Sequence, residues 1–348
     1  MNLSSSPTPL RVVLVHWNQA QACIETIDRF LHREVPVRIT VVDNGSRPEA
    51  LKELTRAVDE RQSQVTLIEV GANAGFGPGA NVGLREFLAD PEDGDWVVLA
   101  PHDVDPFPGC LASMLLEAQA QPMAGLMCAD VGDGMIPVID PYFGGMVVPA
   151  THVRSSAAHG GAGHGGAALD GEGAHWEDAA ADSAEGAHWE DAAFPHGTLM
   201  MLRRDCLAEI GLFDERFFSY CEEADLALRA RAAGWSIGLI RGARVQNIHI
   251  GSGLAVVDYL QTRNTLLLVQ EMSGNYHAFI RAWFTIVQTL RGIQKPSTRP
   301  IIFDARARVM GLRDFVLRRF GPPPSSIAVA PSQFDPSMHG ARNNSSTG

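Results

Sequence analysis

Apolar runs alternate with stretches of helical periodicity over the first hundred residues of the chain. Segments 19–34 and 81–90 have the spacing of amphipathic helices. They lie between apolar runs at 11–17, 37–44, 64–70 and 95–100, and the first two of these runs are rich in β-branched residues and end in polar ones. This alternation predicts βαβ units, and therefore an α/β fold in which helices cover both faces of a mainly parallel sheet.

Polar residues follow each of the four predicted strands. The segments are His16-Trp17-Asn18, Asp43-Asn44-Gly45-Ser46, Gly71-Ala72-Asn73 and His102-Asp103. Ligands of parallel sheets bind beyond the carboxyl ends of the strands. We therefore expect a ligand site where these segments meet.

The second half of the chain begins with a Gly/Ala-rich segment at 152–193. It contains EGAHWEDAA twice, at 172–180 and 185–193, and its composition predicts a flexible insert. After it we expect a strand, a short helix, an aromatic turn, a helix over 222–233 and a strand that runs into His249. The expected divisions are a disordered start (1–9), a first half (10–151), the insert (152–193), a second half (194–265), a helical region (266–321) and a disordered tail (322–348).

Segment 277–296 leaves two alternatives. A helix here would place several large apolar residues on one face, namely Phe279, Trp283, Phe284, Ile286 and Leu290. We expect that face to pack into the core, and a helix lying on a membrane surface is the alternative.

Composition narrows the classes of protein. The formal net charge of −12 and the pI near 5.4 argue against non-specific nucleic-acid binding, which needs a basic face. Five scattered cysteines without a CxxC pair predict reduced thiols and a cytoplasmic protein. The first residues lack the pattern of a signal peptide, and no apolar run has the length of a membrane span.

The stretch GFGPGA, at 75–80, formally matches a dinucleotide-binding fingerprint. That fingerprint belongs to the first βα turn of its unit and needs an acidic residue after the next strand. Here it follows the third predicted strand, and Pro78 interrupts the amides that would hold a phosphate. A dehydrogenase is therefore not expected.

The polar segments together resemble a known family. In chain order they read HWN, VVDNGS, GANAGFGPGANVGL, PHDVD, FDERFFSYCEEADLALRARAAGW and NIHIGSG. In this order and spacing they resemble the family 2 glycosyltransferases of GT-A fold, and most of all a bacterial rhamnosyltransferase-like branch. The resemblance covers roughly residues 10–265, interrupted by the insert.

The resemblance implies roles for individual residues. The residues that would bind the nucleotide sugar are Asn18, Asp43, Asn44, Asn73, Gly75, Phe76 and Asn81, with Asp43 accepting a hydrogen bond from the pyrimidine ring. The family's Asp-x-Asp metal motif is degenerate here, because Pro101 stands in its first position and Asp103 in its second. Asp105 is a register-shifted alternative, and His249 would complete the shell of Mn²⁺ or Mg²⁺.

The family's catalytic carboxylates fall at the start of the helix predicted over 222–233. Glu223 takes the place of the general base, where Asp is commoner, with Glu222 and Asp225 beside it. Three carboxylates at one helix start also suit the helix dipole, and their mutual repulsion would raise at least one pKa. Asp225 and Arg229 are spaced as a helical ion pair, so Asp225 is expected to support the site.

The implied activity is inverting transfer of a sugar, L-rhamnose from dTDP-rhamnose, to a cell-envelope glycan or a polyprenyl-linked acceptor. The implied location is the cytoplasm, with peripheral contact at the inner face of the cell membrane left open. The alternative is a catalytically inactive protein of the same fold that binds a nucleotide or glycan. Two departures from the family pattern keep it open: the first aspartate of the Asp-x-Asp motif is missing, and Glu223 stands where Asp is commoner.

Overall fold

The computed structural model describes residues 8–140, 142, 144, 146–147, 186–248 and 253–328. Within these ranges the main sheet has nine strands, in the order β3-β2-β1-β4-β10-β6-β11-β5 with β9 paired to β11. The strands are β1 (Leu10–His16), β2 (Val37–Asp43), β3 (Val65–Glu69), β4 (Trp96–Pro101), β5 (Val104–Pro106), β6 (Ala124–Asp130), β9 (His188–Asp191), β10 (Met200–Arg203) and β11 (Ser236–Asn247). A separate pair joins β7 (Val138–Ile139) to β8 (Met146–Val147).

The first four strands confirm the predicted parallel sheet. β1 pairs in parallel with β2 on one side and with β4 on the other, and His16 stands opposite Asp43. The chain therefore builds outward from β1 through β2 to β3 and then returns to the other side of β1. A reversal of this kind is where ligands of open parallel sheets bind.

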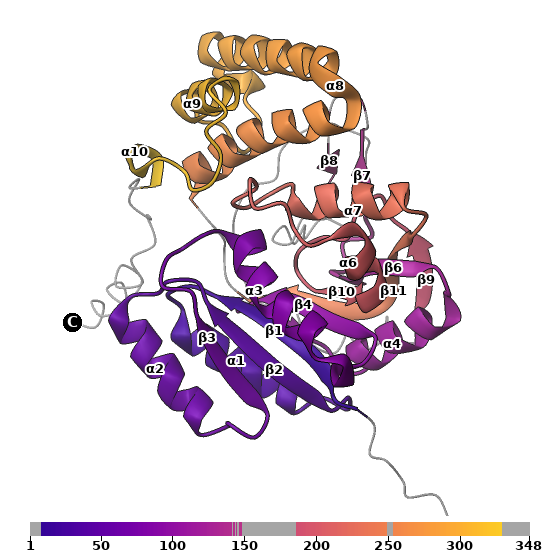
Figure 1. Cartoon of the computed structure of the whole chain (residues 1–348). Helices are drawn as coiled ribbons and strands as arrows, with labels where there is room; N and C mark the ends of the chain where they lie inside the picture. The colour runs from indigo at the N-terminus through magenta and orange to yellow at the C-terminus, as the bar shows by residue number, and fades with distance from the viewer. Residues whose placement is uncertain are drawn as a thin grey trace, which may run out of the picture.

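Helices cover both faces of the sheet, as predicted (Figure 1). Alternate strand residues such as Val12 and Leu14 pack on one face against α1 (Ala20–Leu31), α2 (Pro48–Asp59) and α4 (Cys110–Ala120). Their neighbours Val13 and Val15 pack on the other face, against α3 (Phe76–Ala89), α6 (Arg204–Ile210) and α7 (Glu222–Ala232). Because successive side chains of a strand point to opposite faces, the near-continuous apolar runs supply both cores.

Part of the segment expected as a flexible insert is a strand. The second EGAHWEDAA copy forms β9, which pairs antiparallel with β11 from Gly238 to Arg241. The ring of Trp189 lies so close to Gly238 that an added Cβ would come within 2.5 Å of it. The apolar contact of Trp189 and the unpaired edge of β11 explain why composition alone misjudged residues 186–193. The first copy lies outside the described residues.

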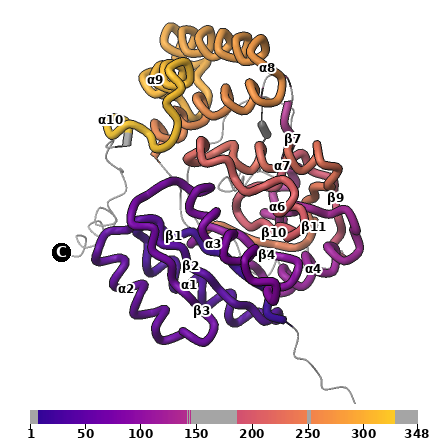
Figure 2. The backbone as a smooth tube through the Cα atoms, viewed as in Figure 1, coloured from indigo at the N-terminus to yellow at the C-terminus, as the bar shows by residue number. Residues whose placement is uncertain are grey.

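A helical hairpin stands beyond the sheet, above α7 in the view of Figure 1, and the same arrangement is visible in Figure 2. It consists of α8 (Leu254–Gln294), the short turn η3 (Pro296–Thr298) and α9 (Ala305–Val316), and α10 (Ser325–Ala328) follows it. α8 turns back at Gly274, whose φ of 84° is left-handed. No helix in the described ranges is long and apolar enough to cross a membrane.

The expectation that segment 277–296 packs through its large apolar residues is wrong. Phe279, Trp283 and Leu290 are 70%, 59% and 53% exposed. The buried positions of this arm are instead small, namely Ala278, Thr285, Thr289 and Gly292. At Gly292 the ring of Phe303 comes so close that an added Cβ would lie 2.6 Å from it. Small residues let the elements of the hairpin approach closely, so the large side chains are left outside.

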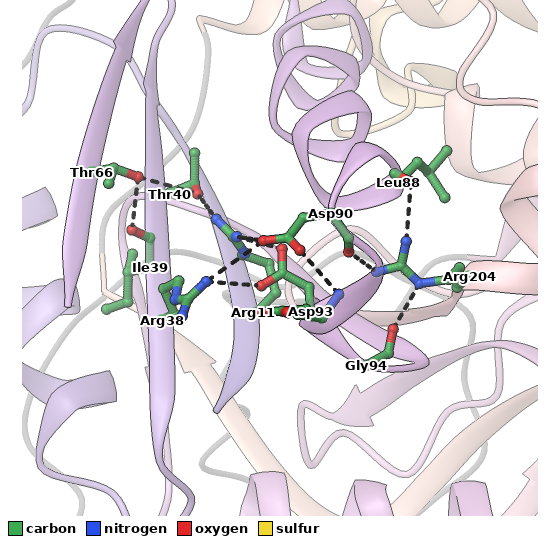
Figure 3. Close-up of polar contacts among 11 residues, drawn as sticks. Arg11, Arg38, Ile39, Thr40, Thr66, Leu88, Asp90, Asp93, Gly94 and Arg204 are labelled. Carbon is green, nitrogen blue, oxygen red and sulfur yellow. Dashed lines mark hydrogen bonds and ion pairs between the residues drawn. The ribbon is translucent and has the colours of Figure 1, made fainter. Parts of the chain in front are cut away.

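A polar network fixes the amino ends of the central strands (Figure 3). The guanidinium of Arg11 is buried and donates to Thr40 Oγ1 at 2.7 Å and to the carboxylate of Asp93. Asp93 lies in η1 (Pro91–Asp93), just before β4, and Arg38 also contacts it at 3.4 Å. Arg204 donates to the carbonyls of residues 88, 90 and 94. The network lies at the opposite ends of the strands from the predicted ligand site.

Replacing Arg11 with Met should lower the free energy of unfolding by about 3 kcal/mol, because the buried carboxylate of Asp93 loses its main partner. Urea denaturation measures the change. The matched control is Arg61→Met, which removes a more exposed pair with Asp28 and should cost less than about 1 kcal/mol. Equal losses in the two variants would contradict this account of the network.

Candidate functional site

A buried histidine and aspartate pair lies at the carboxyl ends of β1 and β2. Nδ1 of His16 donates to Oδ1 of Asp43 at 2.8 Å, and the backbone N–H of Ser46 donates to Oδ2 at 3.0 Å. Burial lowers the pKa of His16, and the hydrogen bond to Asp43 offsets only part of that effect. The ring of His16 meets that of His102 edge-on, with 5.3 Å between centroids. Asp43 is thus held in place beside β1, where the order of the strands reverses from β2 to β4.

Asn44 holds the loop that follows β3. Its side-chain amide donates to the carbonyl of Gly75 at 2.8 Å and to Asn73 Oδ1 at 3.2 Å, and its Oδ1 accepts from the N–H of Ala74. Gly45 permits this approach, because an added Cβ would lie 2.4 Å from the Cα of Ala72. The predicted segments 43–46 and 71–75 are therefore brought together, as expected.

Asn18 joins the same edge. It has a left-handed φ of 62°, its N–H donates to Ser46 Oγ at 2.8 Å, and its Oδ1 accepts from the N–H of Arg47 at 2.8 Å. An asparagine tolerates this backbone better than most residues do. The turn after β1 and the turn after β2 are thereby fixed to each other.

The start of α3 is clamped to the aromatic segment that precedes α7. The N–H of Phe76 donates to the carbonyl of Phe218 at 2.7 Å, and Gly75 (φ 107°) lies so close that an added Cβ would meet that carbonyl at 2.0 Å. Asn81 makes two bonds to the backbone of Phe213, at 2.9 and 3.0 Å. Gly75 and Asn81 thus join the two halves of the chain.

The turn into α7 has an uncommon backbone. Tyr220 and Cys221 both have left-handed φ values, 70° and 75°, although neither is glycine. The side-chain amide of Asn264, on α8, donates to the carbonyls of Ser219 and Tyr220 at 2.8 and 2.9 Å. Non-glycine residues persist in this region only where the surrounding structure holds them. The first arm of α8 therefore determines where α7 begins.

Glu222 and Glu223 form an acidic pair at that helix start. Glu222 is 2% exposed, and its Oε2 has no hydrogen-bond partner among the described residues. Burial, followed by the charge of Glu223, raises the pKa of Glu222 well above its usual value. Burial also raises the pKa of Glu223 to about 7, although its own backbone N–H partly offsets the effect. A carboxyl group with a pKa near neutrality can gain and lose a proton at physiological pH.

The bend at 195–198 supports Glu223 and was not anticipated from the sequence. An added Cβ at Gly197 would lie 2.7 Å from Glu223 Oε1, so only glycine leaves that space to the carboxylate. Next to it, the imidazole Nε2 of the buried His196 lies 2.6 Å from the carbonyl of Ala129, and burial lowers the pKa of His196 to about 4. The only sequence signal is the short PHGT stretch before β10.

Asp225 is engaged in a structural contact. Its carboxylate accepts from Nε and Nη2 of Arg229 at 3.0 and 2.8 Å. The same guanidinium donates to the carbonyls of Ile210 and Leu212, which lead into the segment clamped on α3. The helical ion pair expected from the spacing of Asp225 and Arg229 is thus present, and it ties the start of α7 to residues 210–212.

The two candidate metal-binding aspartates have different surroundings. Asp105, on β5, pairs with Arg33 at 2.8 Å and lies 3.7 Å from Arg29. Asp103 is partly exposed, and within the described chain its carboxylate makes no ion pair. The backbone carbonyl of Asp103 accepts a hydrogen bond from the N–H of Ile248 at 2.9 Å. The next residue, His249, lies outside the described ranges.

These surroundings favour Asp103 over Asp105 as a metal ligand. No cluster of three His, Cys, Asp or Glu side chains with the geometry of a metal site occurs in the described residues. A single free carboxylate suits Mg²⁺ or Mn²⁺ where phosphate oxygens supply further ligands. Asp103 therefore fits a cation that is bound together with a diphosphate.

Comparison with known proteins gives matches of two kinds. The model of a family described as "Glycosyltransferase like family 2" matches residues 7–265. The N-acetylglucosaminyl-diphospho-decaprenol L-rhamnosyltransferases of two Mycobacterium tuberculosis strains are 30% identical over 222 residues, which cover 62% of this chain and 67% of each relative.

Solved structures share the fold at low identity. The mannosyltransferase PcManGT from Pyrobaculum calidifontis, in complex with GDP-Man and Mn²⁺, superposes with a TM-score of 0.53 at 13% identity, over 91% of this chain and 89% of that one. GalNAc-T7, with UDP, GalNAc and Mn²⁺, gives 0.52 at 12% identity, over 88% of this chain and 54% of that one.

The acidic pair makes stability depend on pH. The pKa values of both carboxyl groups are raised in the folded state, so the stability they contribute is fully present below about pH 4.5 and falls as the pH rises through the folded-state pKa values, of which that of Glu223 is about 7. Replacing Glu222 with Gln removes a carboxyl group that burial disfavours as an anion and that the unfolded chain ionises freely. We expect Glu222→Gln to be about 2 kcal/mol more stable than the wild type at pH 8 and nearly equal to it at pH 4.5.

Urea denaturation at the two pH values measures this difference. The control is Glu53→Gln on the exposed side of α2, for which the difference from wild type should not change with pH. A Glu222→Gln variant that is destabilised at pH 8 would show that the glutamate is stabilised as an anion.

Proposed function

The chain belongs to glycosyltransferase family 2, and from this premise we propose that it transfers a sugar from a nucleotide-diphosphate donor to an acceptor hydroxyl with inversion. The observation that carries the proposal is Glu223. Its carboxyl group, with a pKa of about 7, lies at the start of α7 against Gly197. The contacts between residues 75–81 and 213–218 connect that helix start to the strand edge around Asp43 and Asn44.

In the proposed reaction Glu223 acts as the general base. Its carboxylate takes the proton of the acceptor hydroxyl while the hydroxyl oxygen attacks the anomeric carbon. The bond from that carbon to the diphosphate breaks on the opposite face, so the configuration inverts. Glu222 is buried, carries an unpartnered oxygen and has a pKa that the charge of Glu223 raises further, so we assign Glu222 to keep its proton when Glu223 is ionised.

The strand edge would hold the nucleotide sugar. Asp43 has two hydrogen bonds from the protein and retains lone pairs that could accept from a base N–H. Asn18, Asn73 and Phe76 would line the donor around it, on turns that Asn44, Gly75 and Asn81 keep in place. Asp103 would hold Mn²⁺ or Mg²⁺ with His249, and the cation would neutralise the charge that develops on the diphosphate.

The curated relatives support a particular donor and acceptor. Their name describes rhamnosyl transfer to a diphospho-decaprenol carrier. We accordingly propose dTDP-rhamnose as the donor and a polyprenyl-linked or cell-envelope glycan as the acceptor, at the cytoplasmic side of the membrane. An inactive protein that only binds a nucleotide or glycan is the alternative, and the carboxyl group of Glu223 with a pKa of about 7 beside the buried Glu222 favours an enzyme, because perturbed carboxyl groups of this kind cluster at catalytic sites.

Two variants test the role of Glu223. Glu223→Gln removes the base and should lower turnover at least about 100-fold, while donor affinity stays within a few-fold of wild type. Gly197→Ala places a methyl group 2.7 Å from the Glu223 carboxylate and should lower turnover by about tenfold or more. The matched control is Gly186→Ala, where an added Cβ meets nothing within 4 Å, and its activity should be unchanged.

Initial rates with a labelled donor, measured as a function of pH, give the result. The wild type should show a rising limb of kcat/KM near pH 7, because the base must lose its proton. Near-normal turnover in Glu223→Gln would instead assign the base to Glu222 or Asp225. Donor binding without turnover in the wild type, with any acceptor tried, would support the inactive alternative.

A further inference from the structure

The outer arm of α8 carries a continuous stripe of exposed apolar side chains. Its members recur every three or four residues, at Tyr276, Phe279, Trp283, Ile286, Leu290 and Ile293. Side chains at this spacing share one face of a helix. They are 71%, 70%, 59%, 38%, 53% and 52% exposed. Six large apolar residues on one face make an apolar patch that monomeric proteins seldom leave in water.

The stripe is not a packing surface within the described chain. The opposite side of this arm contacts the rest of the hairpin through its small residues, among them Thr285, Thr289 and Gly292. In Figure 1 the arm forms the edge of the molecule farthest from the parallel sheet. A partner outside these residues is therefore needed to cover it.

The charge around the stripe indicates the chemistry of that partner. Segment 272–303 contains no Asp or Glu, and segment 272–328 has nine Arg and Lys against two Asp, in a chain whose net charge is −12. Both aspartates are engaged within the hairpin: Asp304 caps α9, and Asp314 accepts from Tyr259 and pairs with Arg313. Among the cations, Arg308 pairs with Asp258 and Arg313 with Asp314, and the unit keeps an excess of positive charge.

Two of these cations flank the stripe itself. Arg291 and Lys295 are exposed and lie at the end of the stripe, Arg291 directly after Leu290 and Lys295 at the C-cap of α8, two positions after Ile293. An amphipathic surface with basic residues beside Trp, Tyr, Phe and Leu is typical of helices that lie in the headgroup region of a bilayer. A second copy of the chain fits less well, because a twofold contact through this face would bring the two basic units together.

We propose that the outer arm of α8 docks the protein on the surface of a membrane that contains anionic lipids. The apolar stripe would enter the interface, and Arg291 and Lys295 would contact the headgroups. Docking does not require the proposed reaction. It would nevertheless place the site near lipid, because the inner arm of the same helix holds the turn before α7 through Asn264.

Vesicle sedimentation of the full chain tests this proposal. The wild type should sediment with vesicles of phosphatidylcholine and phosphatidylglycerol, and much less with phosphatidylcholine alone or at high salt. The double variant Phe279→Ser/Trp283→Ser should lower partitioning by about tenfold or more. Arg291→Gln/Lys295→Gln should lower it about fivefold for each charge removed.

Matched controls come from elsewhere on the surface. Leu116→Ser/Met123→Ser removes two apolar residues that are 65% and 53% exposed on and just after α4, and Lys52→Gln/Arg56→Gln removes two exposed cations from α2. Both should bind anionic vesicles like the wild type. Circular dichroism of each variant confirms that it is folded.

A second measurement locates the contact on the helix. Brominated lipids should quench tryptophan fluorescence in the wild type, and Trp283→Phe should lose most of the quenching while it keeps most of the binding. The proposal is overturned if the wild type ignores anionic vesicles, or if Phe279→Ser/Trp283→Ser binds like Leu116→Ser/Met123→Ser. It is also overturned if sedimentation velocity shows a dimer that only the stripe variant dissociates and no vesicle binding occurs.

Discussion

The site depends on one turn that the local sequence would not form by itself. Tyr220 and Cys221 stand in left-handed conformations ahead of α7, at a cost of about 1 kcal/mol or more each. The side-chain amide of Asn264, which lies on α8 more than forty residues later in the chain, holds this turn by two hydrogen bonds to its backbone carbonyls. The opposite side of the same segment is fixed through the carbonyl of Phe218 to the start of α3. The position of the acidic pair is therefore set by tertiary contacts on both sides.

This constraint explains how a carboxyl group acquires a pKa near neutrality. Glu222 and Glu223 begin a helix, where the free N–H groups favour anions, yet burial outweighs that effect for both. Gly197 gives the Glu223 carboxylate its space, and His196 anchors the bend beside it to Ala129. The raised pKa values of the acidic pair thus reduce the stability of the fold at neutral pH. The buried ion pair of Arg11 and Asp93 stabilises the amino ends of the strands, away from this site.

Much of this organisation could be predicted from the sequence. The four parallel strands and the helix at 222 follow from periodicity, and the grouping of Asp43, Asn44, Asn73 and Gly75 follows from the rule for strand ends. The hydrogen bonds of Asn81 to Phe213 and the ion pair of Asp105 with Arg33 could not be predicted, because these partners are distant in the sequence. Segment 277–296 was misjudged because periodicity shows which side chains share a face but does not show which face the neighbouring helices cover.

The central claim is that the strand edge binds a nucleotide sugar together with a cation on Asp103. Calorimetric titration of dTDP-rhamnose, UDP-glucose and GDP-mannose, each with and without Mn²⁺, tests it most directly on the wild type, Asp103→Ala and Asp105→Ala. We expect one nucleotide sugar to bind in a metal-dependent way that Asp103→Ala abolishes and Asp105→Ala retains. No binding of any donor, or binding indifferent to metal and to Asp103, would contradict the account.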